Sequence, residues 1–184
     1  MVDGMARLPI VGVMGSGADP CVDRAQQVGR LLAKMGVHLL TGAGGGVMES
    51  VSRAFYETPE RQGCVIGILP CAEGDPLRAP KHGYPNSWVE IPIATHLPLT
   101  GTQGQDDLSR NHINILSADA IVAFPGGPGT LSEVNLALRY KRPVVAFLRD
   151  QSELPGVPEA VQVEGEVAGV RAFLERCFGG ERAR

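Results

Sequence analysis

The sequence predicts an α/β fold in which a doubly wound parallel sheet of about six or seven strands carries helices on both faces. Two observations predict this class. Short, wholly apolar runs alternate with stretches whose apolar residues recur at helical spacing. Strands that are apolar on both sides are typical of a parallel sheet covered by helices on both faces. Glycine-rich turns also follow three of the apolar runs, as expected where such strands end.

The composition is that of one soluble globular domain. The chain has 184 residues, of which 43% are hydrophobic and 20% charged, and its formal net charge is −3. We expect a single domain over 1–184, with a core at about 8–178 and frayed ends. The small negative charge, without an extended basic run, disfavours a nucleic-acid partner. No apolar stretch reaches 18 residues, so we expect no membrane partner either.

Cysteine and histidine spacing favours neither a metal site nor a redox pair. The four cysteines include no C-x-x-C pair, and the four histidines show no ligand spacing. We therefore expect reduced thiols, no metal and no required cofactor. Residues 1–7 lack the basic and then apolar order of a signal peptide, which favours a cytoplasmic location.

The first half of the chain contains two strand–turn–helix units. The run 8–14 predicts a buried strand that ends in Gly15-Ser16-Gly17, followed by a helix from Asp19 or Pro20 to Gly36. The run 38–41 predicts a second strand that ends in a glycine-rich turn at 42–46, followed by a helix over 47–55. One apolar stripe at helical spacing supports the first helix: Cys21, Ala25, Val28, Leu32 and Met35.

The middle of the chain predicts two more strands, at 64–70 and 88–93, separated by a surface loop over 71–87. A helix is expected from Asp106 or Asp107 to about Ser117, with inward contacts from Leu108, Ile115 and Leu116. Its polar face, at i, i+4 and i+7, would consist of Arg110, Asn114 and Ser117.

The last third predicts a strand at 120–124, a helix after the turn that follows it, and a sixth strand at 143–148. A loop over 150–158 and a final helix over 164–178 complete the fold.

The turn at 125–133 carries the clearest chemical signal. Gly126, Gly127 and Gly129 lie between an apolar strand and a helix, where bare backbone N–H groups and a helix dipole suit a phosphate group. The spacing of Thr130 and Glu133 also matches a capping box, in which Glu133 reaches back to the Thr130 amide. A turn with a helix cap and no ligand is therefore the alternative.

Topology predicts where a ligand binds. The glycine-rich turns lie at the carboxyl ends of parallel strands, so we expect them to converge on one Rossmann-like cleft. The chain has neither a complete dinucleotide fingerprint nor a G-x-x-x-x-G-K-[ST] loop. These features favour a nucleotide or another phosphorylated small molecule, held through backbone amides without a lysine clamp.

Residues 125–133 match the pattern P-G-G-x-G-T-x-x-E, and the chain therefore resembles the Lonely Guy (LOG) superfamily, whose older label is "lysine decarboxylase-like". Gly15-Ser16 and Gly44-Gly45-Gly46 resemble the first and second glycine turns of that superfamily. The resemblance covers about residues 8–178. Its branches include phosphoribohydrolases of nucleoside 5′-monophosphates and molybdenum cofactor carrier proteins, which bind a pterin phosphate.

The resemblance implies roles for individual residues. The amides of Gly126, Gly127, Gly129 and Thr130 would hold the 5′-phosphate, and Glu133 would act at the glycosidic bond. Arg110, the second candidate catalytic residue, matches the arginine of an M-H-x-R-K-like segment. Asn111 stands where that segment has lysine, which favours the carrier-like branch. The first and second glycine turns, by the same resemblance, and Asn114, from the polar face of its helix, complete the predicted ligand-binding set.

Two functions follow from the resemblance. The first is a hydrolase that cleaves a nucleoside 5′-monophosphate into free base and ribose 5-phosphate, with a carboxylate stabilising the charge at the anomeric carbon. The alternative is a non-catalytic molybdenum cofactor carrier or a nucleotide-binding sensor. Nothing in the sequence marks a lysine decarboxylase. The resemblance also implies a homodimer or a higher homo-oligomer.

Overall fold

The computed structural model describes residues 7–75, 77 and 79–179. The chain ends, where fraying is predicted, lie outside these ranges. The seven strands of the described residues form one parallel sheet in the order β4-β3-β2-β1-β5-β6-β7, which confirms the predicted fold class. The strands are β1 (Ile10–Met14), β2 (His38–Thr41), β3 (Val65–Leu69), β4 (Ile91–Ala94), β5 (Ala120–Ala123), β6 (Val144–Phe147) and β7 (Gln162–Glu164).

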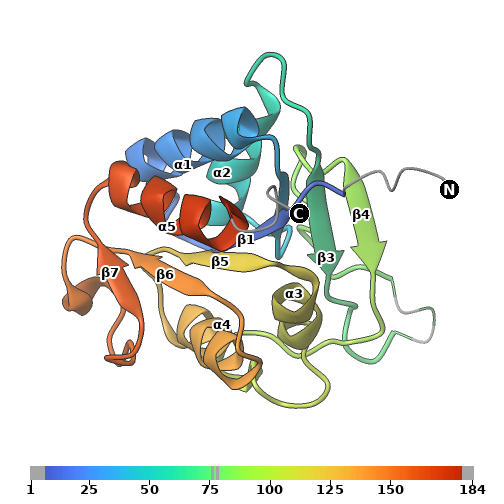
Figure 1. Cartoon of the computed structure of the whole chain (residues 1–184). Helices are drawn as coiled ribbons and strands as arrows, with labels where there is room; N and C mark the ends of the chain where they lie inside the picture. The colour runs from blue at the N-terminus through green and yellow to red at the C-terminus, as the bar shows by residue number, and fades with distance from the viewer. Residues whose placement is uncertain (1–6, 76, 78, 180–184) are drawn as a thin grey trace, which may run out of the picture.

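Helices cover both faces of the sheet (Figure 1). On one face lie α1 (Val22–Met35), α2 (Val47–Tyr56) and α5 (Val167–Gly179), and on the other lie α3 (Asn111–Ser117) and α4 (Pro128–Arg139). Two short 3-10 helices, η1 (Gly101–Gln103) and η2 (Gln151–Glu153), lie in the connections. Each face of the sheet has its own apolar core.

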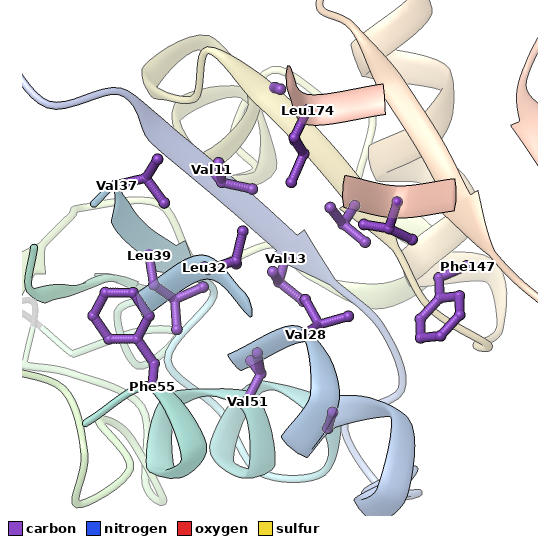
Figure 2. Close-up of a cluster of buried hydrophobic side chains, with 14 of the residues drawn as sticks. Val11, Val13, Val28, Leu32, Val37, Leu39, Val51, Phe55, Phe147 and Leu174 are labelled. Atoms are coloured by element: carbon purple, nitrogen blue, oxygen red, sulfur yellow. The ribbon is translucent and has the colours of Figure 1, made fainter. Parts of the chain in front are cut away.

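The core under α1, α2 and α5 shows how the predicted stripes pack (Figure 2). Val28 and Leu32 of α1 and Phe55 of α2 are fully buried and belong to the same cluster as Val11 and Val13 of β1. Successive side chains of a strand point to opposite faces of the sheet, so each strand contributes residues to both cores. This explains why the strands are apolar throughout.

Helix α1 begins at Val22, two or three residues later than predicted. The delay has a local cause: Ser16 Oγ accepts hydrogen bonds from the amides of Ala18 and Asp19, and Asp19 Oδ1 accepts one from the amide of Cys21. Side-chain acceptors of this kind compete with helical hydrogen bonds. The predicted end is confirmed, because Gly36 closes the helix with φ 68°.

Helix α3 is shorter than predicted and begins at Asn111. Ser109 forms an isolated parallel bridge with Leu99, and its amide donates to Asp106 O, so residues 106–109 form a turn. Leu108 and Leu116 are 54% and 46% exposed, so their predicted inward contacts are wrong, whereas Ile115 is fully buried.

The edges of the sheet differ from the prediction in two places. Gln162–Glu164 pairs with β6 as β7, and the last helix therefore begins at Val167, three residues later than predicted. At the other edge, β4 spans Ile91–Ala94 rather than 88–93, and all four of its residues are exposed. Edge strands this short and this exposed carry little of the burial signal on which sequence patterns depend. No helix of the described chain is both long and apolar enough to span a membrane.

Candidate functional site

The candidate site lies where the strand order reverses. Strands β1 and β5 are neighbours in the sheet although more than 100 residues separate them, and the chain proceeds outward from them in opposite directions. The turns that follow these two strands are joined directly, because the Ser16 amide donates to Pro125 O over 3.0 Å. This is the switch point at which open α/β sheets bind their ligands.

A cleft of about 320 Å³ opens at this point. Seven of the predicted site residues line it: Gly15, Ser16, Arg110, Gly127, Gly129, Thr130 and Glu133. Gly126, Asn114 and the three glycines of the second turn are not among the lining residues. The structure therefore brings together the first and third glycine turns with both candidate catalytic side chains.

The N-terminus of α4 supplies free amides to the cleft. Gly127 is the N-cap, and Pro128, which has no N–H, occupies the first helical position. Within the described chain, the amides of Gly127, Gly129 and Thr130 have no hydrogen-bond partner, as expected for the first turn of a helix. All three residues line the cleft.

The Gly126 amide, which was predicted to hold a phosphate, donates to Glu153 O over 3.2 Å, and Gly126 does not line the cleft. Gly126 matters for a steric reason instead. A Cβ atom at this position would collide with the Thr130 hydroxyl and Cβ atom. The glycine thus allows the turn to pack against α4 while η2 holds its amide.

The predicted capping box is also wrong. Because the helix begins at Pro128, Thr130 lies inside its first turn and cannot be the N-cap. No side chain caps this helix. Glu133 is consequently free of a capping role and lies buried beside α3.

The second glycine turn supports the site from behind. Gly46 has φ 61°, and a Cβ atom there would collide with Ser16 O, which accepts a hydrogen bond from the Val47 amide over 2.9 Å. Gly45 likewise packs against Gly17 O. Gly44, Gly45 and Gly46, which were predicted to contact the ligand, do not line this cleft. Gly45 and Gly46 pack against the first turn, and Gly44 packs against Met48 and Tyr84.

Glu133 has an unusual environment. Burial raises the pKa of its carboxyl group from 4.5 to about 7, although the Arg110 charge and a hydrogen bond from Asn114 act in the opposite direction. Asn114 Nδ2 donates to Glu133 Oε1 over 3.3 Å. A carboxyl group with a pKa near neutrality can give or accept a proton, which is the property required of a general acid or base.

Arg110 is a buried cation that makes no salt bridge in the described structure. Its side chain is 4% exposed, and its Nε and Nη1 atoms have no hydrogen-bond partner. The guanidinium lies over the Tyr84 ring, 5.6 Å from the centroid, and against the Cα of Gly42. An unpaired buried charge is costly, so a cleft-lining arginine of this kind indicates an anionic ligand.

Asn111 has a structural explanation. This residue stands where the LOG-like segment has lysine, and here its Nδ2 donates to Ser132 Oγ on α4 over 3.1 Å. Ser132 Oγ in turn donates to Gly129 O. Asn111 therefore links α3 to the first turn of α4, while also lining the cleft.

Tyr84 and Met48 line the cleft but were not predicted. Tyr84 belongs to the 71–87 loop, which is fastened to the second glycine turn by Asn86: its amide donates to Ala43 O over 2.8 Å and its Nδ2 to Gly44 O over 2.9 Å. No local pattern in the loop points to this contact.

Comparison with known proteins agrees with the resemblance to the LOG superfamily. A family model described as the SLOG cluster4 family matches residues 8–169. An uncharacterized protein of Archaeoglobus fulgidus is 31% identical over 143 residues, which are 77% of this chain and 81% of that protein.

Solved structures that are similar along almost the whole chain include two named for the molybdenum cofactor. The molybdenum cofactor binding protein from the phototrophic bacterium Rippkaea orientalis is 32% identical with a TM-score of 0.71, over 94% of this chain and 98% of that chain. The molybdenum cofactor carrier protein of Chlamydomonas reinhardtii is 32% identical with a TM-score of 0.66, over 94% and 99%. These matches place the chain in the LOG-like branch near the carrier proteins. The chain belongs to the SLOG cluster4 family.

Proposed function

We propose that the cleft binds the phosphate group of a phosphorylated pterin, the molybdenum cofactor, and that the protein acts as a carrier of this ligand. The observation that carries the proposal is that two independent anion-binding groups lie in one cleft. The free amides at the N-terminus of α4 and the unpartnered Arg110 guanidinium line the same cleft. Helix N-termini and buried arginines both stabilise phosphate groups.

The charge balance of the cleft supports an anionic ligand. Since the Glu133 pKa is about 7, this carboxyl group is only partly ionised at neutral pH and offsets the Arg110 charge incompletely. This balance favours an anionic ligand beside Arg110. The volume of about 320 Å³ lies in the usual range for small-molecule sites. Similar structures whose names refer to the molybdenum cofactor, such as those from Rippkaea orientalis and Chlamydomonas reinhardtii, favour this ligand over other phosphates.

One observation favours a second candidate, a phosphoribohydrolase. Glu133 combines burial, a pKa near neutrality and an orienting hydrogen bond from Asn114. A carboxylate placed beside an anomeric carbon stabilises the positive charge that develops when an N-glycosidic bond breaks. In this function, the same amides and Arg110 hold the 5′-phosphate of a nucleoside monophosphate.

The carrier proposal is tested by direct binding. The purified protein is incubated with molybdenum cofactor released from a molybdoenzyme, separated from free ligand, and oxidised so that bound pterin is measured by fluorescence. We expect near-stoichiometric retention, weakened at least about tenfold in Arg110→Gln, since a hydrogen bond to a charged group contributes about 1.5–3 kcal/mol. Arg139→Gln, which removes an exposed arginine at the far end of α4, is the matched control.

Retention that is equal in the wild type and in Arg110→Gln would overturn this assignment of the site. The hydrolase is tested separately by incubating the protein with nucleoside 5′-monophosphates and measuring free base by chromatography. Base release that disappears in Glu133→Gln supports the hydrolase. Absence of release in the wild type, together with retained pterin, leaves the carrier function alone.

A further inference from the structure

A second cavity adjoins the phosphate cleft. Its volume is about 490 Å³, and Ala18 lines both cavities. The first glycine turn lies between the two cavities. Gly46 lines the second cavity and packs against Ser16 and Gly17 of this turn. The side chains that give this cavity its chemical character are Glu49, Ser50, Arg53, Ser87 and Trp88.

Trp88 gives the second cavity an aromatic wall. The indole is half-buried, and its position is fixed from two sides. The Trp88 amide donates to Asn86 Oδ1 over 3.1 Å, and the ring of Tyr56 packs against the indole with a centroid separation of 5.6 Å. An indole on the wall of a cavity offers aromatic contact area to a flat heterocycle.

Two charged side chains give the cavity opposite hydrogen-bonding properties. The exposed Glu49 carboxylate supplies only acceptors. The Arg53 guanidinium supplies only donors: its Nε donates to Glu57 Oε1 over 3.0 Å, and its terminal nitrogens have no hydrogen-bond partner in the described ranges. The guanidinium lies over the Trp88 ring, 5.5 Å from the centroid.

We propose that the second cavity is a ring subsite for a 2-amino-4-oxopyrimidine, the unit shared by pterins and guanine. Such a ring presents an N–H and an amino group side by side, which a carboxylate accepts together, and an oxo group beside them, which a guanidinium donates to. Adenine presents an acceptor nitrogen where this ring has the N–H, so Glu49 disfavours it. The inference rests on the proposed function, in which the adjoining cleft holds the phosphate.

Isothermal titration with four probes tests the subsite: GMP, AMP, the phosphate ester of 6-hydroxymethylpterin, and inorganic phosphate. We expect GMP and the pterin ester to bind at least about tenfold tighter than AMP, the difference that one charge-assisted hydrogen bond provides. Glu49→Gln, a change of an exposed residue, reduces this preference to about threefold or less. Trp88→Leu weakens every ring-bearing probe and leaves inorganic phosphate unchanged.

Glu175→Gln, which removes an exposed carboxylate on α5, is the charge-matched control and changes none of the four affinities. Equal affinities for GMP and AMP in the wild type would overturn the ring subsite. So would an unchanged preference in Glu49→Gln, measured with protein whose thermal transition matches that of the wild type. In either case, binding of inorganic phosphate leaves the proposed function standing. Failure of all four probes to bind overturns the ring subsite and the proposed function together. Tighter binding of the pterin ester than of GMP assigns the ring as a pterin.

Discussion

Asn114 Nδ2 donates to Glu133 Oε1 over 3.3 Å, and this hydrogen bond joins the two helices on one face of the sheet at the candidate site. It is the only side-chain hydrogen bond that Glu133 makes in the part of the chain described, and the other Asn114 amide atom, Oδ1, is buried without a partner. The carboxyl group is therefore under-solvated rather than strongly held. Whether this carboxyl group is protonated therefore decides its effect on stability.

The proton on Glu133 makes stability depend on pH. Because the folded-state pKa of about 7 exceeds the ordinary value of 4.5, the folded protein keeps a proton that the unfolded chain releases between these values. Stability therefore falls as pH rises through this window, and the full penalty of about 3 kcal/mol is present above pH 7. Glu133→Gln removes the penalty.

We accordingly expect Glu133→Gln to be more stable than the wild type at pH 8, by up to about 3 kcal/mol, and close to it at pH 4.5. Urea unfolding of both proteins at the two pH values measures the difference. A stability difference that does not change with pH would show that Glu133 titrates normally.

The main features of the fold could be predicted from the sequence because they depend on local patterns. The strands β1, β2, β3, β5 and β6 are apolar on both faces, and each of the first four helices follows a glycine or polar turn. The convergence of the first and third turns followed from topology, since adjacent parallel strands end at the same edge. What failed were the boundaries, where side-chain acceptors or bridges replaced helical hydrogen bonds.

The parts of the site that were not predicted depend on tertiary contacts. Nothing near Gly46 in the sequence shows that it packs against Ser16, and nothing near Tyr84 shows that it lies over Arg110. The capping pattern of Thr130 and Glu133 was misleading because the helix begins two residues before Thr130. A local motif cannot show which of two uses a buried carboxyl group serves.

The two glycines before α4 should respond differently to alanine. A Cβ atom at Gly126 would collide with the Thr130 side chain, whereas one at Gly127 meets nothing within 4 Å. Both positions have negative φ or extended backbone outside the left-handed region. We expect Gly126→Ala to destabilise the protein by about 1–3 kcal/mol, as overpacking does. Gly127→Ala should cost less, at most about 1 kcal/mol, because alanine is only a poorer N-cap than glycine. Chemical denaturation measures both, and equal effects would contradict the steric explanation.

An ion pair braces the same turn. Arg24 Nη1 and Nη2 contact the two carboxylate oxygens of Glu153 at 2.6 and 3.0 Å, and Glu153 O accepts the Gly126 amide. The pair lowers the pKa of Glu153, chiefly through the hydrogen bond from Arg24. Its contribution is therefore present above the ordinary glutamate pKa and is lost as pH falls through the lowered value.

A double-mutant cycle with Arg24→Gln and Glu153→Gln should give a coupling of about 1 kcal/mol at pH 7, because the geometry is bidentate and the side chains are 15% and 21% exposed. The exposed pair of Arg171 and Glu175, at 3.4 Å on α5, is the control and should give less than about 0.5 kcal/mol. A coupling energy that is no larger for Arg24 and Glu153 than for the control pair would show that this ion pair does not stabilise the turn.

The crossing of α1 and α2 depends on Gly29. A Cβ atom at this position would meet Val51 O at 2.7 Å and the Ala54 Cβ atom at 2.8 Å, so the two helices could not keep their present separation. Alanine has the higher helix propensity, by about 1 kcal/mol, and in an isolated helix the substitution would stabilise. Here the steric cost should exceed this gain. We expect Gly29→Ala to lower stability by about 1–3 kcal/mol, measured by urea unfolding, and an increase in stability would mean that the crossing can relax without loss of packing.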